Sequence, residues 1–231
     1  MQISAPIYRL KRQAKEDARR RDVPLHEALD TAAQAEGYQS WGHLSASASA
    51  RPADRIFPKL SEGDLILIGA RPGHGKTLLG LELAVAASRH GWRALFFTLD
   101  YTEADVAARL KDLGVDPRAT DLIVDTSDNI CADHIAARIQ VEGARVFAVI
   151  DYLQLLDQRR TTPPLDAQLH TLRRCANEGA VVAAISQIDR SFDLGAGDMP
   201  TLADVRLPNA ADLSLFTKTC FLHNGAVRFS D

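Results

Sequence analysis

A glycine-rich turn followed by a lysine and a threonine is the stretch of this sequence best suited to chemistry. After an apolar run at residues 65–70, the chain reads Arg71, Pro72, Gly73, His74, Gly75, Lys76, Thr77 and Leu78. This spacing fits the phosphate-binding loop, with Ala70 in place of the first glycine. Backbone N–H groups of such a loop surround phosphate oxygens, and its lysine carries positive charge to the β- and γ-phosphates. We therefore predict that this segment binds a nucleotide, with Lys76 also catalytic and the Thr77 hydroxyl as a ligand of Mg²⁺.

Polar side chains follow three other apolar runs, each typical of a buried strand. They are Asp100, Asp151 and Gln187. Ligands of open parallel sheets bind at the carboxyl ends of the strands, so these positions are candidates for one site. We predict that Asp151 is a Mg²⁺ ligand, that Asp100 is the general base that orients water, and that Gln187 senses the γ-phosphate. The alternatives are a cap or turn role for Asp151 and loop hydrogen bonds for the other two.

The elements that must position these residues alternate between strand and helix patterns. Strands are predicted at residues 65–70, 94–99, 121–125, 146–150 and 181–186, and helices at 76–90, 103–113, 131–142 and 165–178. The strands are apolar throughout, which is expected when helices cover both faces of a parallel sheet. Thr102 and Asp105 form a predicted capping pair. The fold class is therefore α/β, with a mostly parallel sheet covered by helices on both faces.

The C-terminal part departs from this alternation. Residues 188–211 show no periodicity, which indicates a functional or disordered connection rather than a packed one. After it, residues 213–222 and 226–230 flank His223-Asn224-Gly225, which is typical of a hairpin turn.

The N-terminal part reads as a small all-helical unit. We assign residues 1–45 to this module, 46–54 to a linker of small and polar residues, and 55–231 to the phosphate-loop domain. The first helix carries a row of basic residues: Arg9, Lys11, Arg12, Lys15, Arg19, Arg20 and Arg21. This row is either a solvated helix face or a contact for nucleic acid or a partner protein.

Composition narrows the class of protein. The chain has 231 residues, a net charge of −3 and 46% hydrophobic residues, as in ordinary soluble proteins. Any contact with nucleic acid must therefore come from local basic patches. The three cysteines are widely spaced, which predicts reduced core thiols and no metal site of their own. Because the sequence lacks a signal core and a membrane span, we expect a cytoplasmic protein that does not contact membranes.

Six motifs, taken in order, resemble those of a known family. They read ARPGHGKT, TLDYT, VIDYLQLL, LHTLRRCANE, SQIDR and TLADVRLPNAADL. Together they resemble the DnaB family of replicative helicases, whose ATPase domain has the RecA-like P-loop fold. The resemblance runs over residues 55–222. It implies ATP and Mg²⁺ as cofactors, with Lys76 and Thr77 at the phosphates and metal, Asp151 as the Walker B acid and Gln187 as the sensor.

The resemblance also implies partners. It places the loop of residues 189–209 against single-stranded DNA in the channel of a homo-oligomeric ring, for which a hexamer is one of the sizes left open. Arg190 and Arg206 are the cations of this loop. In the C-terminal strands, Lys218 and Arg228 are candidates for the basic group that reaches a neighbour's ATP. The block GYQSWGHL near the N-terminus resembles a helical module associated with a glyoxalase-related domain, and it implies no glyoxalase chemistry.

Two departures from the family pattern matter for function. Asp100 stands where the family has glutamate, so the carboxylate arm is shorter by one methylene. Misplacement on the scale of about 1 Å can cost ~10²-fold in rate, which makes slow hydrolysis plausible. The family's large amino-terminal domain and linker helix are replaced in our interpretation by the small basic unit.

Two functions stay open at this point. One is a DnaB-type ATPase that acts on DNA as an oligomer, with a protein partner bound by the N-terminal module. The alternative is a nucleotide-dependent regulator or scaffold, like KaiC-like or accessory ATPases, with slow hydrolysis and no unwinding. A dinucleotide oxidoreductase is excluded because the glycine turn lacks the third glycine of that motif. An inactive paralogue is disfavoured by the intact Lys76, Thr77 and Asp151.

Overall fold

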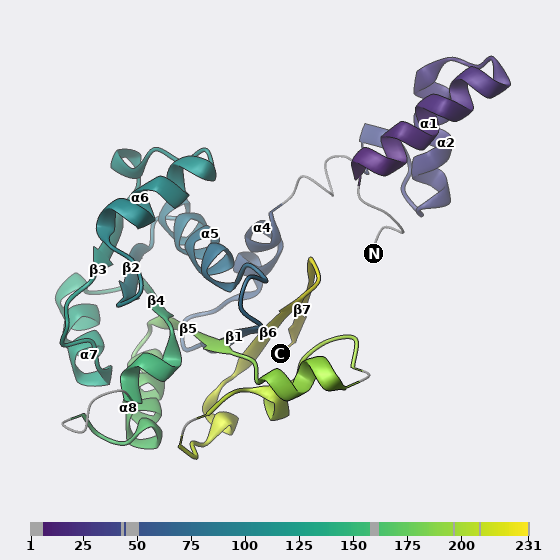
Figure 1. Ribbon diagram of the computed structural model, residues 1–231. Helices are drawn as coiled ribbons and strands as arrows, with labels where there is room; N and C mark the ends of the chain where they lie inside the picture. Colours follow the sequence, from purple (N-terminus) through teal and green to yellow (C-terminus); the bar gives the residue numbers. More distant parts are fainter. Residues whose placement is uncertain are drawn as a thin grey trace. The chain divides into compact units, whose positions relative to one another are not determined.

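The computed structural model divides the chain into two compact units. It describes residues 7–42, 44, 51–157, 162–195, 197–207 and 209–230. The first unit spans Met1–Arg51 and the second spans Pro52–Asp231. Both units appear in Figure 1.

The first unit is helical, as predicted. It contains α1 (Ile7–Arg21) and α2 (Leu25–Ala35), and its small core holds Leu10, Ala33 and Leu44 with Tyr38 and Trp41 packed against them. The basic residues of α1 from Lys11 to Arg21 are exposed, so this helix presents charge to solvent along one side.

The second unit is built on one seven-stranded sheet, seen edge on in Figure 1. Its strand order is β3-β2-β4-β5-β1-β6-β7, and all neighbouring pairs are parallel except the antiparallel β6–β7 hairpin. The strands are β1 (Leu65–Ala70), β2 (Arg93–Thr98), β3 (Leu122–Asp125), β4 (Val146–Asp151), β5 (Val181–Gln187), β6 (Lys218–His223) and β7 (Ala226–Ser230).

Helices cover both faces of this sheet. The helices α4 (Pro52–Ile56), α5 (Lys76–Arg89) and α6 (Glu103–Asp112) contribute to the core on one face, and α7 (Ala132–Glu142) and α8 (Leu165–Asn177) to the core on the other. Successive strand residues serve opposite faces, as the pleat requires: Leu65 and Leu67 pack toward α8, whereas Ile66 and Ile68 pack toward α5. The predicted fold class is thereby confirmed.

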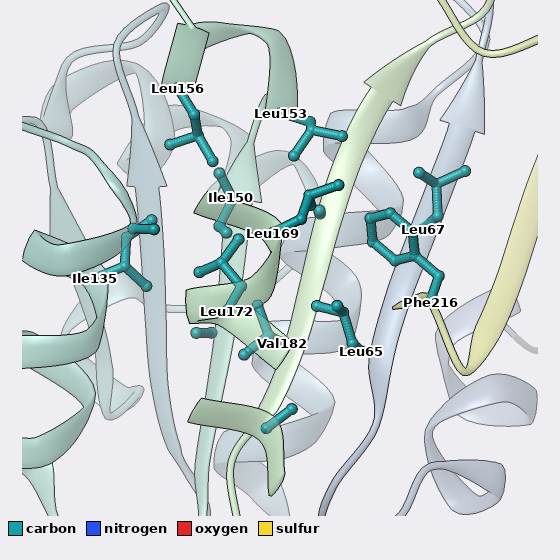
Figure 2. Close-up of a cluster of buried hydrophobic side chains, with 14 of the residues drawn as sticks. Leu65, Leu67, Ile135, Ile150, Leu153, Leu156, Leu169, Leu172, Val182 and Phe216 are labelled. Atoms are coloured by element: carbon teal, nitrogen blue, oxygen red, sulfur yellow. The ribbon is translucent and has the colours of Figure 1, made fainter. Parts of the chain in front are cut away.

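Figure 2 shows the core on the α7 and α8 face. Leu169 and Leu172 of α8 lie over Ile150 and Val182 of the central strands, with Ile135 of α7 beside them. All of these side chains are almost fully buried. This packing fixes the central strands, and it thereby fixes the backbone that leads to the residues at their carboxyl ends.

Short 3-10 turns connect these elements. They are η1 (Phe57–Lys59), η2 (Pro117–Ala119), η3 (Leu153–Asp157), η4 (Arg190–Leu194), η5 (Leu202–Asp204) and η6 (Leu213–Leu215). The capping box predicted at Thr102 and Asp105 is present at the start of α6. The hairpin predicted around residues 223–225 is present as β6 and β7. No helix among the described residues is long and apolar enough to cross a membrane.

Two expectations need correction. The predicted linker of residues 46–54 overlaps α4. Pro52 suits a first helical turn, and Ala53 and Ile56 bury apolar surface against α5. Residues 45–50 lie outside the described part of the chain.

The segment 188–211 is more packed than its lack of periodicity indicated. Ile188, Phe192 and Val205 are buried in the core, since one apolar residue per short turn is enough to attach an irregular segment.

The cysteines are only partly core residues. Cys175 and Cys220 are buried, and burial raises the pKa of the Cys220 thiol to about 12. Cys131 is half-buried at the start of α7.

Candidate functional site

The glycine-rich turn connects the end of β1 to the start of α5. Gly73 has a φ of 82° and Gly75 a φ of 86°, which is the left-handed region where a side chain would be strained. The chain can therefore turn tightly between Ala70 and Lys76, the last residue of the strand and the first of the helix. The turn leaves the N-terminal N–H groups of α5 available to an anion.

The strand register brings the predicted polar residues to one edge of the sheet. Ala70 pairs with Gln187 across β1 and β5, and Thr98 pairs with Asp151 across β2 and β4. These strand ends therefore lie side by side with the glycine-rich turn. Asp100 lies two residues past the end of β2, exposed, with its backbone N–H donating to the Thr98 hydroxyl at 3.2 Å.

Asp151 is the buried acid of this edge. The Thr77 hydroxyl lies close enough to lower the pKa of its carboxyl, and the residue is only 2% exposed. Burial raises its pKa to about 6, although the Thr77 hydroxyl and the Lys76 charge act in the opposite direction. Its Oδ2 atom is buried and makes no hydrogen bond to any described residue.

This orphaned oxygen is a test of whether the residues suit a metal. Hydroxyl and carboxylate oxygens are the ligands that Mg²⁺ prefers. A cation at Asp151 Oδ2 would also compensate the cost of keeping that carboxylate ionised away from water. Thr77 and Asp151 therefore fit a Mg²⁺ site at the end of the glycine-rich turn.

Gln187 sits in a network that fixes the end of β5. The side-chain amide of buried Gln154 donates to the Ser186 hydroxyl at 2.8 Å and to the Arg206 carbonyl at 2.6 Å. The Arg206 backbone N–H in turn donates to the Gln187 carbonyl at 2.8 Å. The backbone of Gln187 is thus held between the Gln154 side chain of η3 and Arg206, and its own side chain is half-buried.

Arg71 is directed toward a different partner from a nucleotide. Its Nε and Nη2 atoms lie 2.9 Å and 2.8 Å from Asp193 Oδ2, and its Nη1 group donates to the Ile188 carbonyl at 3.0 Å. The side chain predicted to bind nucleotide therefore ties the glycine-rich turn to η4. What Arg71 can offer a phosphate directly is its backbone.

His74 connects the same turn to the C-terminal hairpin. Its Nδ1 atom accepts the backbone N–H of Asn224 at 3.0 Å, so this nitrogen carries no proton in that arrangement. The ring also stacks on His223, with 5.1 Å between centroids. The hairpin tip thus lies against the turn of its own chain.

The predicted basic residues lie in different settings. Arg190 is exposed on η4, and Arg206 is exposed next to Gln187 at the site edge. Lys218 lies at the start of β6, 3.9 Å from Asp64, and the register places it beside Ile66 rather than beside the glycine-rich turn.

Arg228 donates to the Pro200 carbonyl at 2.7 Å. Neither Lys218 nor Arg228 projects from the hairpin tip, because the side chains there are those of His223 and Asn224. The role expected of both residues in a neighbour's site stays a prediction. The remaining loop residues, Pro72 and Leu78, are exposed, Leu78 by 40%.

Arg109 is a cation at this edge that the sequence did not predict. The Arg109 guanidinium lies over the Tyr101 ring at 4.3 Å and lines an open pocket together with Asp100. Its charge also lowers the pKa of Asp151, as a smaller effect than burial. The spacing of Arg109 within α6 gave no signal, since a helical arginine is common. Gln154 did leave a signal, being a polar residue inside the apolar VIDYLQLL run.

A parallel sheet with a phosphate-loop turn at its carboxyl edge defines the class: a P-loop domain of the RecA-like fold. A solved ATPase domain superposes with a TM-score of 0.60 at 21% identity, covering 71% of each chain. A DnaB-like replicative helicase, solved in a study of its interactions with primase, gives a TM-score of 0.59 at 17% identity, covering 93% of this chain and 64% of the other. These two likenesses concern the fold alone.

Sequence comparison shows which known proteins the chain is similar to. Residues 48–114 match the family described as DnaB-like helicase C terminal domain. The replicative DNA helicase DnaB of Leifsonia xyli is 28% identical over 223 residues, covering 80% of this chain and 48% of that protein. A probable plasmid replicative DNA helicase of Chlamydia muridarum is 27% identical over 195 residues, covering 68% and 43%.

The second unit therefore has the RecA-like fold, and its sequence is similar to that of DnaB-type helicases. The chain spans less than half the length of these two curated relatives. The resemblance of the first unit to a glyoxalase-related module stays a prediction.

Proposed function

We propose that this chain binds and hydrolyses Mg²⁺-ATP at the carboxyl edge of its sheet and that it does so as a DnaB-like motor. The observation that carries the proposal is the Thr77–Asp151 pair beside Lys76, with a buried carboxylate oxygen free to bind a cation. A surface turn between strand and helix would not require a buried acid behind it.

Each residue has a distinct role in the proposed reaction. The backbone of Gly73, His74 and Gly75 and the Lys76 ammonium hold the β- and γ-phosphates. Thr77 and Asp151 hold Mg²⁺, which neutralises charge on the phosphate oxygens when it is bound. Asp100 is the group that accepts the proton of the attacking water and orients it. Gln187, fixed through its backbone, contacts the γ-phosphate.

Action on DNA as an oligomer is the second part of the proposal. It is supported by the relatives, which are named replicative DNA helicases. On this proposal the exposed Arg190 and Arg206 contact the phosphates of single-stranded DNA, in the cytoplasm, and a ring of subunits completes each site. The N-terminal unit, with its exposed basic helix, would bind a further partner.

A second candidate function rests on Asp100. Its carboxylate is exposed and shorter than glutamate, so it is poorly suited to hold a water molecule rigidly. A nucleotide-dependent regulator or scaffold would bind ATP tightly and hydrolyse it slowly, without unwinding.

ATP hydrolysis with and without single-stranded DNA, alongside mass measurement in ATP and ADP, separates the two candidates. The motor predicts DNA-stimulated turnover that is lost in Lys76→Ala and weakens steeply with salt. The regulator predicts slow turnover indifferent to DNA and a change of oligomer size with the nucleotide. Absence of ATP binding would contradict both.

A further inference from the structure

The contact between Arg71 and η4 is not explained by nucleotide binding alone. Three donor groups of one guanidinium are used, two toward Asp193 Oδ2 and one toward the Ile188 carbonyl. The Arg71 side chain is only 16% exposed, whereas that of Asp193 is 48% exposed. A partly buried arginine whose donor groups already have partners is better suited to hold two segments together than to bind a ligand.

The segment that Arg71 holds is a loop, and hydrogen bonds near residues 188–189 and 204–205 join its two ends. It begins where the Ile188 N–H donates to the Ala70 carbonyl at 3.1 Å, and it closes where Asp189 N–H donates to the Asp204 carbonyl at 2.8 Å. Ile188 and Val205 form an antiparallel bridge at its base. Between these bonds η4 is attached by the buried Phe192 and by Arg71.

The two ends of the Arg71 contact differ in how they respond to a nucleotide. Arg71 lies two residues before Gly73, in the turn whose backbone would close around phosphates. Asp193 lies three residues after Arg190, on an exposed 3-10 turn. Phosphate bound at the glycine-rich turn would restrict the backbone that carries Arg71, so the entropy cost of holding η4 through its guanidinium would fall.

We infer that Arg71 and Asp193 form a positioning pair through which nucleotide binding holds η4 against the glycine-rich turn and so fixes Arg190. This inference rests on the proposed nucleotide site and adds a residue pair to it. The pair touches neither the reacting atoms nor Mg²⁺. Its effect is on how often η4 opens.

Trypsin cleavage after Arg190 reports that opening, because the neighbouring Phe192 is buried and the segment must detach before it can be cut. The full chain is digested with and without Mg²⁺ and a non-hydrolysable ATP analogue, and cleavage at Arg190 is timed by mass spectrometry. For the wild type we expect the analogue to slow this cleavage by about 5-fold or more.

The variants are Arg71→Ala, Asp193→Asn and the double variant. Each is expected to reduce the protection to less than about 2-fold, and the double variant to behave like Arg71→Ala, because both members act through one contact. Asp193→Asn replaces an exposed side chain by one of the same shape, so it tests the contact even if Arg71→Ala folds poorly. Arg93→Ala, which removes a surface arginine paired with Glu142, is the matched control and should keep full protection.

Analogue affinity, measured by calorimetry on the same samples, separates a failure of the pair from a failure of the site. If the wild type binds no analogue, the proposed function fails and the inference fails with it. If the analogue binds and protection at Arg190 is the same in Arg71→Ala or Asp193→Asn as in the wild type, the inference alone is overturned. Protection lost in these variants with affinity kept supports it.

Discussion

At the scale of single residues, Asp151 is the most constrained group of the candidate site. It lies at the end of a buried strand, near the Thr77 hydroxyl and the Lys76 charge, and its pKa is nevertheless raised to about 6 because burial outweighs both. Without a metal, the ionised carboxylate is therefore a cost to the fold. With a metal, the same carboxylate becomes a strong ligand.

This balance predicts a pH dependence of stability. The pKa of Asp151 rises from 3.8 to about 6 on folding, so between these values the folded state holds more protons and the free energy of unfolding falls as pH rises. Asp151→Asn removes this loss. Without Mg²⁺, we expect the variant to be more stable than the wild type near neutral pH by on the order of 2 kcal/mol, and not at pH below 4.

Chemical denaturation of both proteins at the two pH values measures the difference. A gap between variant and wild type that does not change with pH would show that Asp151 does not titrate as proposed. In the wild type, Mg²⁺-dependent ATP affinity should also fall as pH drops through 6, because the metal needs the deprotonated acid.

Asp100 carries a second prediction at this scale. Asp100→Asn should abolish hydrolysis while leaving ATP affinity unchanged, because the amide cannot accept the proton of the attacking water. Asp100→Glu restores the longer arm and should raise kcat, by as much as ~10²-fold if misplacement limits the rate. Steady-state hydrolysis and calorimetric binding give the two readouts, and turnover that is unaltered in Asp100→Asn rules out the role.

At the scale of elements, the position of α5 against the sheet depends on Gly80. A Cβ atom at this residue would lie 2.8 Å from Ile185 Cδ1 and 3.1 Å from Val149 Cγ1. The close approach brings the start of α5, with Lys76 and Thr77, down onto the strand ends. Glycine lowers helix propensity, so its presence in the middle of α5 is a cost offset by this packing.

Gly80→Ala should therefore destabilise the protein despite the gain in helix propensity, by about 1–3 kcal/mol. Ile185→Val removes the Cδ1 atom that collides and by itself should cost about 0.5–1.5 kcal/mol. The double variant should be more stable than the sum of the two single effects. Additive effects in urea denaturation would mean that the clash is relieved elsewhere.

Some elements of the second unit were predictable from the sequence, and others were not. The strands and helices of the second unit were predictable because each apolar run is bounded by polar or glycine residues, and the carboxyl edge of a parallel sheet then brings Lys76, Asp151 and Gln187 together. The attachment of the segment after β5 was not predictable. Its bonds join Arg71 to Asp193, 122 positions apart, and His74 to Asn224, 150 positions apart.

Such contacts leave no local pattern in a single sequence. Phe192 and Val205 are single apolar residues among polar ones, with no period to reveal that they are buried. The strand register of Lys218 is likewise not visible in the sequence, although its residue type and approximate position are. Register places Lys218 beside Ile66, four positions before Ala70.

At the scale of the whole molecule, the glycine-rich turn is held on two sides by later parts of its own chain. Arg71 joins it to η4 and His74 joins it to the tip of the β6–β7 hairpin. A nucleotide bound at the turn would therefore affect the position of both the segment that carries Arg190 and the hairpin. On the proposed function, nucleotide state would change the contacts that this segment and the hairpin make with DNA or with a second subunit.

The measurement that tests the proposed site most directly is calorimetric titration of the full chain with ATP, with and without Mg²⁺. We expect binding that strengthens with Mg²⁺, falls by at least about 10-fold in Lys76→Ala through loss of the charge on the phosphates, and is unchanged in the surface control Lys59→Ala. Asp151→Asn should lose the Mg²⁺ effect while keeping the residual affinity. Equal affinities in the wild type and in Lys76→Ala, or no response to Mg²⁺, would contradict the proposed site.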